Sequence, residues 1–227
     1  MHIHLISIFP DIFESFFSTS LIGKAIEKKL ITVSFVNPRD FCDDKHQQID
    51  DEPYGGGDGM VMKAEPMIMA VESVVEDMVG HKSFKIVMPS PAESIFDQRH
   101  ALSWSSFEHL IFVCGRYEGI DVRFEEYMEK MYADHFVKVS LGKFVLLGGE
   151  VASMTMVEAV VRLVSGVIKE SGSWQDESYN PLKGMNNIEH PQYTRPSEVR
   201  WMKVPDVLLS GDQHKIEEWR NGQILDV

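Results

Sequence analysis

Short apolar runs rich in β-branched residues alternate along this chain with segments in which apolar residues recur at helical spacing. The runs predict strands over residues 2–9, 31–36, 84–88, 109–114 and 135–139. The helical spacing predicts helices over residues 10–25, 65–79, 96–103, 124–131 and 151–164. Strands that alternate with helices predict an α/β domain with a largely parallel sheet.

The periodic pattern stops near residue 166. Glycine, serine and proline are frequent from there to residue 184, which is typical of a mobile linker. A proline-rich segment and a short helical stretch over residues 212–220 follow. The pattern therefore predicts a domain over 1–165, a mobile linker over 166–182 and a small, mainly helical domain over 183–227.

Composition narrows the class of protein. The 227 residues are 44% hydrophobic, which suffices for a normal core. The two cysteines, Cys42 and Cys114, form neither a disulfide framework nor a metal-binding spacing, so we expect a reducing cytoplasm. No apolar run has the length of a membrane span, so we expect no membrane partner. The net charge of −13 argues against loose, non-specific binding of nucleic acid.

The segment Val139–Glu150 reads V-S-L-G-K-F-V-L-L-G-G-E, and the remaining candidate chemistry is organised around it. Its glycines interrupt an apolar run just before a predicted helix. Such a pattern fits a strand with tight turns at both ends, and it fits equally a loop that offers bare backbone amides and carbonyls to a ligand.

Two further loops contain unusual chemistry. Asp50–Met60 reads D-D-E-P-Y-G-G-G-D-G-M, and we interpret Tyr54 and Met60–Met62 as apolar anchors beside a backbone that packs closely on a ligand or partner. Cys114–Asp121 reads C-G-R-Y-E-G-I-D and follows an apolar strand. A cation, an aromatic ring and a carboxylate between glycines favour a binding site over a structural turn.

These motifs occur in one order along nearly the whole chain, together with I-S-I-F-P, P-R-D-F, P-Q-Y-T-R-P and V-L-L-S-G-D. In that order they resemble the bacterial tRNA (guanine-N1)-methyltransferase family of the TrmD type. The resemblance implies a SPOUT-type α/β domain with a deep trefoil knot. It also implies a homodimer with active sites at the subunit interface. The hydrophobic pattern alone predicts only the parallel sheet, since knotted chains are rare.

The resemblance implies that S-adenosyl-L-methionine binds mainly to the backbone of three loops. The cofactor-binding residues are then Met88, Pro89, Ser90 and Pro91, Gly115, Tyr117 and Glu118, and Ser140, Leu141, Gly142, Phe144, Leu146, Gly148 and Gly149. We expect contacts with a tRNA substrate from Asp50, Tyr54, Gly57 and Arg195. The family also depends on Mg²⁺, for which the sequence shows no dedicated ligands.

The implied reaction is methylation of N1 of the guanosine 3′-adjacent to the anticodon, position 37 of tRNA. Because N1 of neutral guanine carries a proton, a general base has to remove it, and a cation should stabilise the charge that develops on O6. The resemblance gives the cation role to Arg162. It places the base in the linker, where alignment on a serine favours Glu177 and leaves Asp176 one residue earlier.

Two alternatives remain open at this level. One is a SPOUT-type RNA methyltransferase that modifies a ribose 2′-hydroxyl or another base. The other is a protein that binds cofactor or RNA without catalysis.

Overall fold

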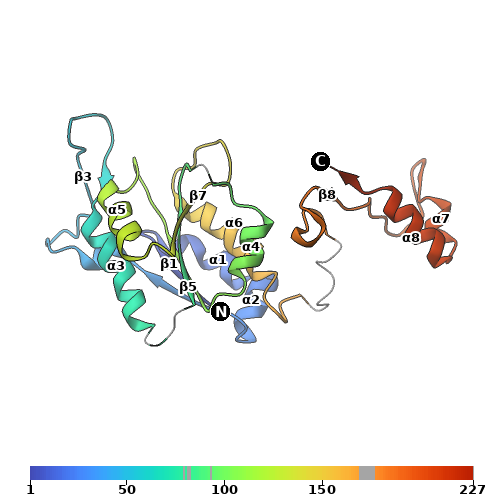
Figure 1. Cartoon of the computed structure of the whole chain (residues 1–227), viewed down its shortest axis with the longest axis horizontal. Coiled ribbons are helices and arrows are strands. Elements are labelled where there is room, and N and C mark those ends of the chain that lie inside the picture. Colours follow the sequence, from blue (N-terminus) through green and yellow to red (C-terminus); the bar gives the residue numbers. More distant parts are fainter. Residues whose placement is uncertain (79, 81–82, 93, 169–176, 227) are drawn as a thin grey trace. The chain divides into compact units, whose positions relative to one another are not determined.

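The structure is a computed structural model, and it describes residues 1–78, 80, 83–92, 94–168 and 177–226 (Figure 1). The chain divides into two compact units, residues 1–169 and residues 170–227.

A five-stranded parallel sheet forms the centre of the first unit, with the order β2-β1-β6-β5-β7. This confirms the predicted α/β fold with a largely parallel sheet. A short antiparallel hairpin, β3–β4, projects from the unit (Figure 1). The strands are β1 (His2–Ile6), β2 (Thr32–Val36), β3 (Asp50–Asp51), β4 (Val61–Met62), β5 (Phe84–Pro89), β6 (His109–Val113) and β7 (Phe136–Val139).

Helices cover both faces of this sheet (Figure 1). One core contains residues of α1 (Glu14–Ser18), α2 (Ser20–Glu27), α4 (Gln98–Trp104) and α6 (Gly149–Val161). The other contains residues of α3 (Ala64–Asp77) and α5 (Val122–Met131). Alternate residues of each strand enter opposite cores, as Leu5 and Ile6 do, because successive strand side chains point to opposite faces.

The predicted helical stretch over residues 10–25 is interrupted. It consists of the 3₁₀-helix η1 (Pro10–Phe13), then α1, then α2. The break follows from the backbone, since Thr19 is extended and Ser20 has a positive φ of 57°. A second 3₁₀-helix, η2 (Pro38–Phe41), lies between β2 and β3.

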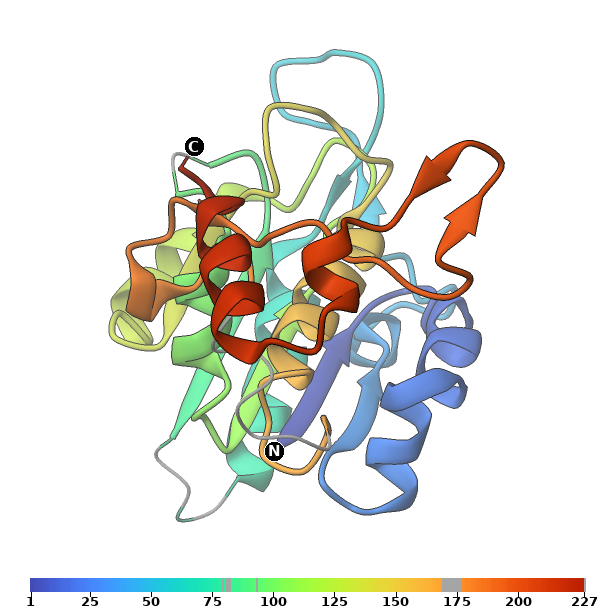
Figure 2. The ribbon, with the colours of Figure 1, turned by 90° about the vertical axis from the view of Figure 1, so that its right-hand side faces the viewer.

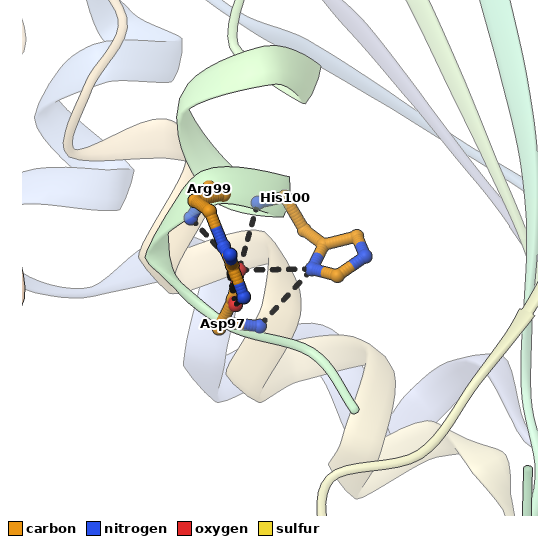
Figure 3. Close-up of polar contacts among 3 residues, drawn as sticks. All are labelled: Asp97, Arg99 and His100. Atoms are coloured by element: carbon orange, nitrogen blue, oxygen red, sulfur yellow. Dashed lines mark hydrogen bonds and ion pairs between the residues drawn. The ribbon is translucent and has the colours of Figure 1, made fainter. Parts of the chain in front are cut away.

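Helix α4 begins at a capping box built on Asp97 (Figure 3). The Asp97 carboxylate accepts from the backbone N of Arg99 at 2.9 Å and of His100 at 3.2 Å, while Nδ1 of His100 lies 3.3 Å from the backbone N of Asp97. The Arg99 side chain also donates to Oδ2 of Asp97. Burial alone would raise the pKa of Asp97, but the hydrogen bonds from Arg99 and His100 outweigh it and hold this pKa below its ordinary value.

The second unit contains short elements. Helices α7 and α8 lie side by side, and the β9–β10 hairpin projects beside them (Figure 2). Asp212 caps α8, so the predicted helix over 212–220 starts one residue later. The elements are η3 (Pro181–Lys183), β8 (Asn187–Ile188), β9 (Glu198–Val199), β10 (Met202–Lys203), α7 (Asp206–Leu209), α8 (Gln213–Gly222) and β11 (Leu225–Asp226), with β8 and β11 paired. None of the helices in the described residues is both long enough and apolar enough to span a membrane.

Candidate functional site

A cavity of about 280 Å³ lies where the chain leaves the carboxyl ends of β6, β5 and β7. Neighbouring carboxyl ends in an open parallel sheet are where such folds bind ligands. Every residue predicted to bind the cofactor lines this one cavity, although the three loops are far apart in sequence. The lining also includes Arg116, Gly119, Val139, Val145, Leu147 and Ala152, and only Ala152 lies outside the segments that the sequence singled out.

Ser140 joins the loop after β7 to the segment before α4. Its backbone N donates to the carbonyl of Ser94 at 2.9 Å, and its carbonyl accepts from the backbone N of Phe96 at 2.8 Å. Its hydroxyl donates to the carbonyl of Gly142 at 2.9 Å. The cavity wall is therefore held by hydrogen bonds between two segments that follow adjacent strands.

Gly148 and Gly149 allow two loops to approach at backbone distance. A Cβ on Gly149 would lie 2.9 Å from Cα of Cys114 and 3.2 Å from the backbone N of Gly115. The backbone N of Gly149 instead donates to the carbonyl of Gly115 at 2.9 Å. Between β7 and α6, residues 140–148 run through bends and isolated bridges without forming a strand, so this part of Val139–Glu150 is a loop and not a turn-flanked strand.

An ion pair joins the cavity-lining Arg116 to the buried Glu150. Nε of Arg116 is 2.8 Å from Oε2 of Glu150, whose side chain is completely buried. These two atoms make no well-aligned hydrogen bond, so we treat the contact as electrostatic. The hydroxyl of Ser7 donates to Oε1 of Glu150 at 2.8 Å, and the Arg116 guanidinium lies 4.9 Å from the ring centre of Phe9. The network links the segment after β1, the Gly115–Glu118 loop and α6.

The glycine-rich hairpin touches the cavity through Gly59. A Cβ on Gly59 would lie 2.6 Å from Cγ of Glu118, a cavity-lining residue. The backbone N of Glu118 donates to the carbonyl of Met60 at 3.0 Å. Asp50, Tyr54 and Gly57 do not line the cavity. Met62 is fully buried, but Tyr54 is fully exposed, so its interpretation as an apolar anchor was wrong.

Of the residues predicted to perform the chemistry, only Arg162 lies in the first unit, and it is outside the cavity. Arg162 caps the C-terminus of α6, about 20 Å along this helix from Gly149 at the usual helical rise. Glu177 lies in the second unit, where its carbonyl accepts from Nδ2 of Asn187 at 3.0 Å. Asp176 falls outside the described residues.

Arg195 also lies in the second unit and lines a different cavity, of about 390 Å³. Tyr193 and Trp219 line the same cavity, with ring centres 6.2 Å apart. The structure thus assembles the predicted cofactor residues in one place, whereas Arg162, Asp50, Tyr54 and Gly57 of the same unit lie outside that cavity.

Sequence reasoning missed Arg116 and Glu150 as a pair. In the sequence, Arg116 stands out as a cation between glycines and Glu150 as an acid at the end of an apolar run. No sequence pattern connects these two positions.

Comparison with known proteins gives a consistent match. The profile of the family described as tRNA (Guanine-1)-methyltransferase TrmD matches residues 1–226. A protein of Clostridium botulinum (strain Kyoto / Type A2) is 44% identical over 226 residues, covering 99% of this chain and 87% of the relative. Relatives from Carboxydothermus hydrogenoformans and Listeria innocua are 43% and 41% identical over 225 residues, covering 99% of this chain and 83% and 87% of their own lengths. All three are named tRNA (guanine-N(1)-)-methyltransferase.

Proposed function

The chain belongs to the tRNA (guanine-1)-methyltransferase family, and we propose that it methylates N1 of guanosine 37, the nucleotide 3′-adjacent to the anticodon of cytoplasmic tRNA. S-adenosyl-L-methionine is the proposed methyl donor. The observation that carries the proposal is the convergence of three loops on a single cavity, lined by every residue predicted for this cofactor.

The cavity suits a cofactor held through its polar edges and by the backbone. Its volume of about 280 Å³ is near the lower end of small-ligand pockets, about 300–1,000 Å³. Gly142, Gly148 and Gly149 place backbone without side chains along one wall, where neighbouring protein groups pack closely, and Glu118 adds a carboxylate suited to a cationic group. When bound, S-adenosyl-L-methionine supplies an electrophilic methyl group.

The protein supplies a base and a cation. We propose that Glu177 or Asp176 removes the N1 proton of the target guanine, because the protonated nitrogen is a poor nucleophile. Arg162 is proposed to lie against O6, where negative charge develops as the proton leaves. Asp50, Tyr54, Gly57 and Arg195 are proposed to contact the tRNA.

A homodimer with shared sites explains why Arg162, in the same unit as the cavity, does not line it in one chain. Arg162 lies at the far end of α6, about 20 Å from Gly149. Val145 and Leu147 on the cavity rim are 88% and 90% exposed, which is unusual for aliphatic side chains unless a partner covers them. We therefore propose that the second subunit supplies Arg162 and the linker carboxylate.

The deep trefoil knot is part of the proposal. It is supported by the contact between the segment before α4 and the loop after β7, including the bridge of Ile95 with Ser140. The described residues contain no group of three or more neighbouring carboxylates. Since Mg²⁺ prefers oxygen ligands, we assign it no protein site and no step in the reaction.

Methyl transfer to matched tRNA transcripts tests the acceptor. A transcript with guanosine at position 37 should gain one methyl group on N1, and the adenosine-37 transcript should gain none. Equal methylation of both transcripts would contradict the proposal.

Single-turnover rates identify the base. Glu177→Ala and Asp176→Ala should differ, with the true base losing about 10²–10⁴-fold. Glu189→Ala, an exposed carboxylate of the same unit, is the matched control and should retain the wild-type rate. Full activity in both linker variants would exclude both residues.

Mixed dimers test the shared site. Arg162→Ala and Gly149→Val homodimers should each be inactive. Random 1:1 co-assembly should restore about a quarter of wild-type activity, because half of the dimers then contain one intact composite site. No recovery in verified mixed dimers would contradict the shared arrangement.

A further inference from the structure

Three histidines meet at the edge of the sheet opposite the cofactor cavity. His2 and His4 are two residues apart on β1, so their side chains share one face of the sheet. His109 is the register partner of His2 on β6 and therefore points to the same face. The N label in Figure 1 marks the end of the sheet at which the parallel strands begin. The cavity lies at the other end, where the strands finish. The cluster plays no part in the proposed reaction.

The imidazoles are close enough to share an ion. One ring nitrogen from each of His2, His4 and His109 lies within 4.8 Å of the other two. Nε2 of His4 is 3.0 Å from Nδ1 of His109. Two nitrogens at that separation can both bind one metal at about 2.0–2.1 Å, with an angle of about 90° at the ion.

The surroundings already orient His4 for such a role. The hydroxyl of Ser34, on β2, lies 2.8 Å from Nδ1 of His4. In the tautomer with a proton on Nδ1, His4 donates to this hydroxyl, and the lone pair of Nε2 is then directed toward His109. A hydrogen bond to the second ring nitrogen is the usual outer-shell support of a histidine ligand.

Simple packing does not account for the cluster. His4 is only 6% exposed, and Nε2 of His2 is buried without a hydrogen-bond partner in the part of the chain that the structure describes. Leaving a buried polar atom unpaired costs about 1–3 kcal/mol, and an aliphatic residue here would avoid that cost. An ion bound to Nε2 of His2 would satisfy that atom.

We propose that His2, His4 and His109 form a binding site for one divalent transition-metal ion, of which Zn²⁺ is the test case. Neutral imidazoles suit zinc, nickel and copper, whereas Mg²⁺ and Ca²⁺ prefer oxygen ligands. His2 and His109 are only partly buried, so an ion can enter from solvent and retain water at an open position. Because the ligands come from β1 and β6, the ion joins the first strand to the central strand of the sheet.

Calorimetric titration of the untagged, chelator-treated full chain tests the site. Zn²⁺ should bind with one ion per chain and raise the melting temperature, while Mg²⁺ at the same concentration should do neither. Co²⁺ should give the visible absorption bands of a nitrogen-ligated ion. Absence of stoichiometric Zn²⁺ binding, or displacement of Zn²⁺ by equimolar Mg²⁺, would overturn the proposal.

Variants locate the ion. The partly buried ligands are the safer changes, so His2→Gln and His109→Gln should each weaken Zn²⁺ binding by more than 100-fold, and Ser34→Ala by about 10–100-fold. His46→Gln, at an exposed histidine outside the cluster, is the matched control and should bind as wild type. Without added Zn²⁺, His109→Gln should transfer methyl groups at the wild-type rate. Zn²⁺ binding that survives in both ligand variants would overturn the proposal, since the ion would then sit elsewhere.

Discussion

Gly149→Ala tests the close approach on which the cofactor cavity depends. The added Cβ would lie 2.9 Å from Cα of Cys114 and 3.2 Å from the backbone N of Gly115. Carbon atoms in ordinary contact are about 3.5–4.0 Å apart, so the overlap is roughly 0.5–1 Å. The obstructing atoms are backbone at the end of β6, a strand hydrogen-bonded on both sides, and cannot turn away as a side chain can.

The magnitude follows from two opposing effects. Overpacking of this kind costs about 1–3 kcal/mol. Replacing glycine by alanine also reduces the entropy of the unfolded chain, which contributes about 0.4–1 kcal/mol in the stabilising direction. We expect a net loss of about 1–2 kcal/mol, or about 2–8 °C in melting temperature for a chain of this size.

The same displacement should weaken cofactor binding more than it weakens folding. Calorimetry should show at least a tenfold higher Kd for S-adenosyl-L-methionine, since the hydrogen bond from Gly149 to the Gly115 carbonyl is lost as the loops separate. Gly222→Ala is the control, because a Cβ there meets nothing within 4 Å. Wild-type stability together with wild-type affinity in Gly149→Ala would refute the steric reasoning.

Three further predictions concern other parts of the first unit. Arg116→Met should destabilise the fold by about 3–5 kcal/mol, because the fully buried Glu150 loses its cation. In thermal unfolding, adding Glu150→Gln should recover part of that lost stability. Strictly additive effects of the two substitutions would contradict the pairing. Asp97→Ala should cost about 1 kcal/mol at pH 7. The pKa of Asp97 in the folded protein lies below its ordinary value. Its electrostatic contribution to stability is therefore present above the ordinary pKa and disappears as the pH falls through the folded pKa. Urea unfolding at pH 7 and pH 2.5 should show that the stability difference between Asp97→Ala and wild type shrinks in acid. Cys114 should react with iodoacetamide at pH 8 at least tenfold more slowly than Cys42, since burial raises the pKa of the Cys114 thiol to about 12. Equal labelling of the two cysteines in the folded protein, measured by mass spectrometry, would contradict this difference in reactivity.

Local patterns located the central elements well. Each predicted strand of the sheet is present within a few residues of its expected bounds, because a strand buried on both faces needs a short apolar run whatever its neighbours are. The failure at residues 10–25 has a local cause. Helical spacing of apolar residues persists there, but the backbone turns at Thr19 and Ser20, and spacing does not record backbone angles.

The loops at the cavity were predictable for a similar reason, whereas their role in cofactor binding was taken from the family resemblance. Gly148 and Gly149 stand where a Cβ would meet Arg116 or the backbone of Cys114, and glycines at such positions show in the sequence itself. The exposure of Tyr54 was not predictable, since an aromatic residue beside glycines reads the same whether it is buried or projects into solvent.

The amino-acid sequence by itself determined the order of strands and helices and the loops that end at the cavity, because periodicity and glycine placement act over a few residues. Only the tertiary structure decided which distant residues meet. The pairing of Arg116 with Glu150 depends on the loop after β6 meeting the start of α6. The meeting of His2 with His109 depends on β1 lying beside β6 in one register. Strand order and register arise from the packing of the whole sheet, so no local stretch of the chain encodes them.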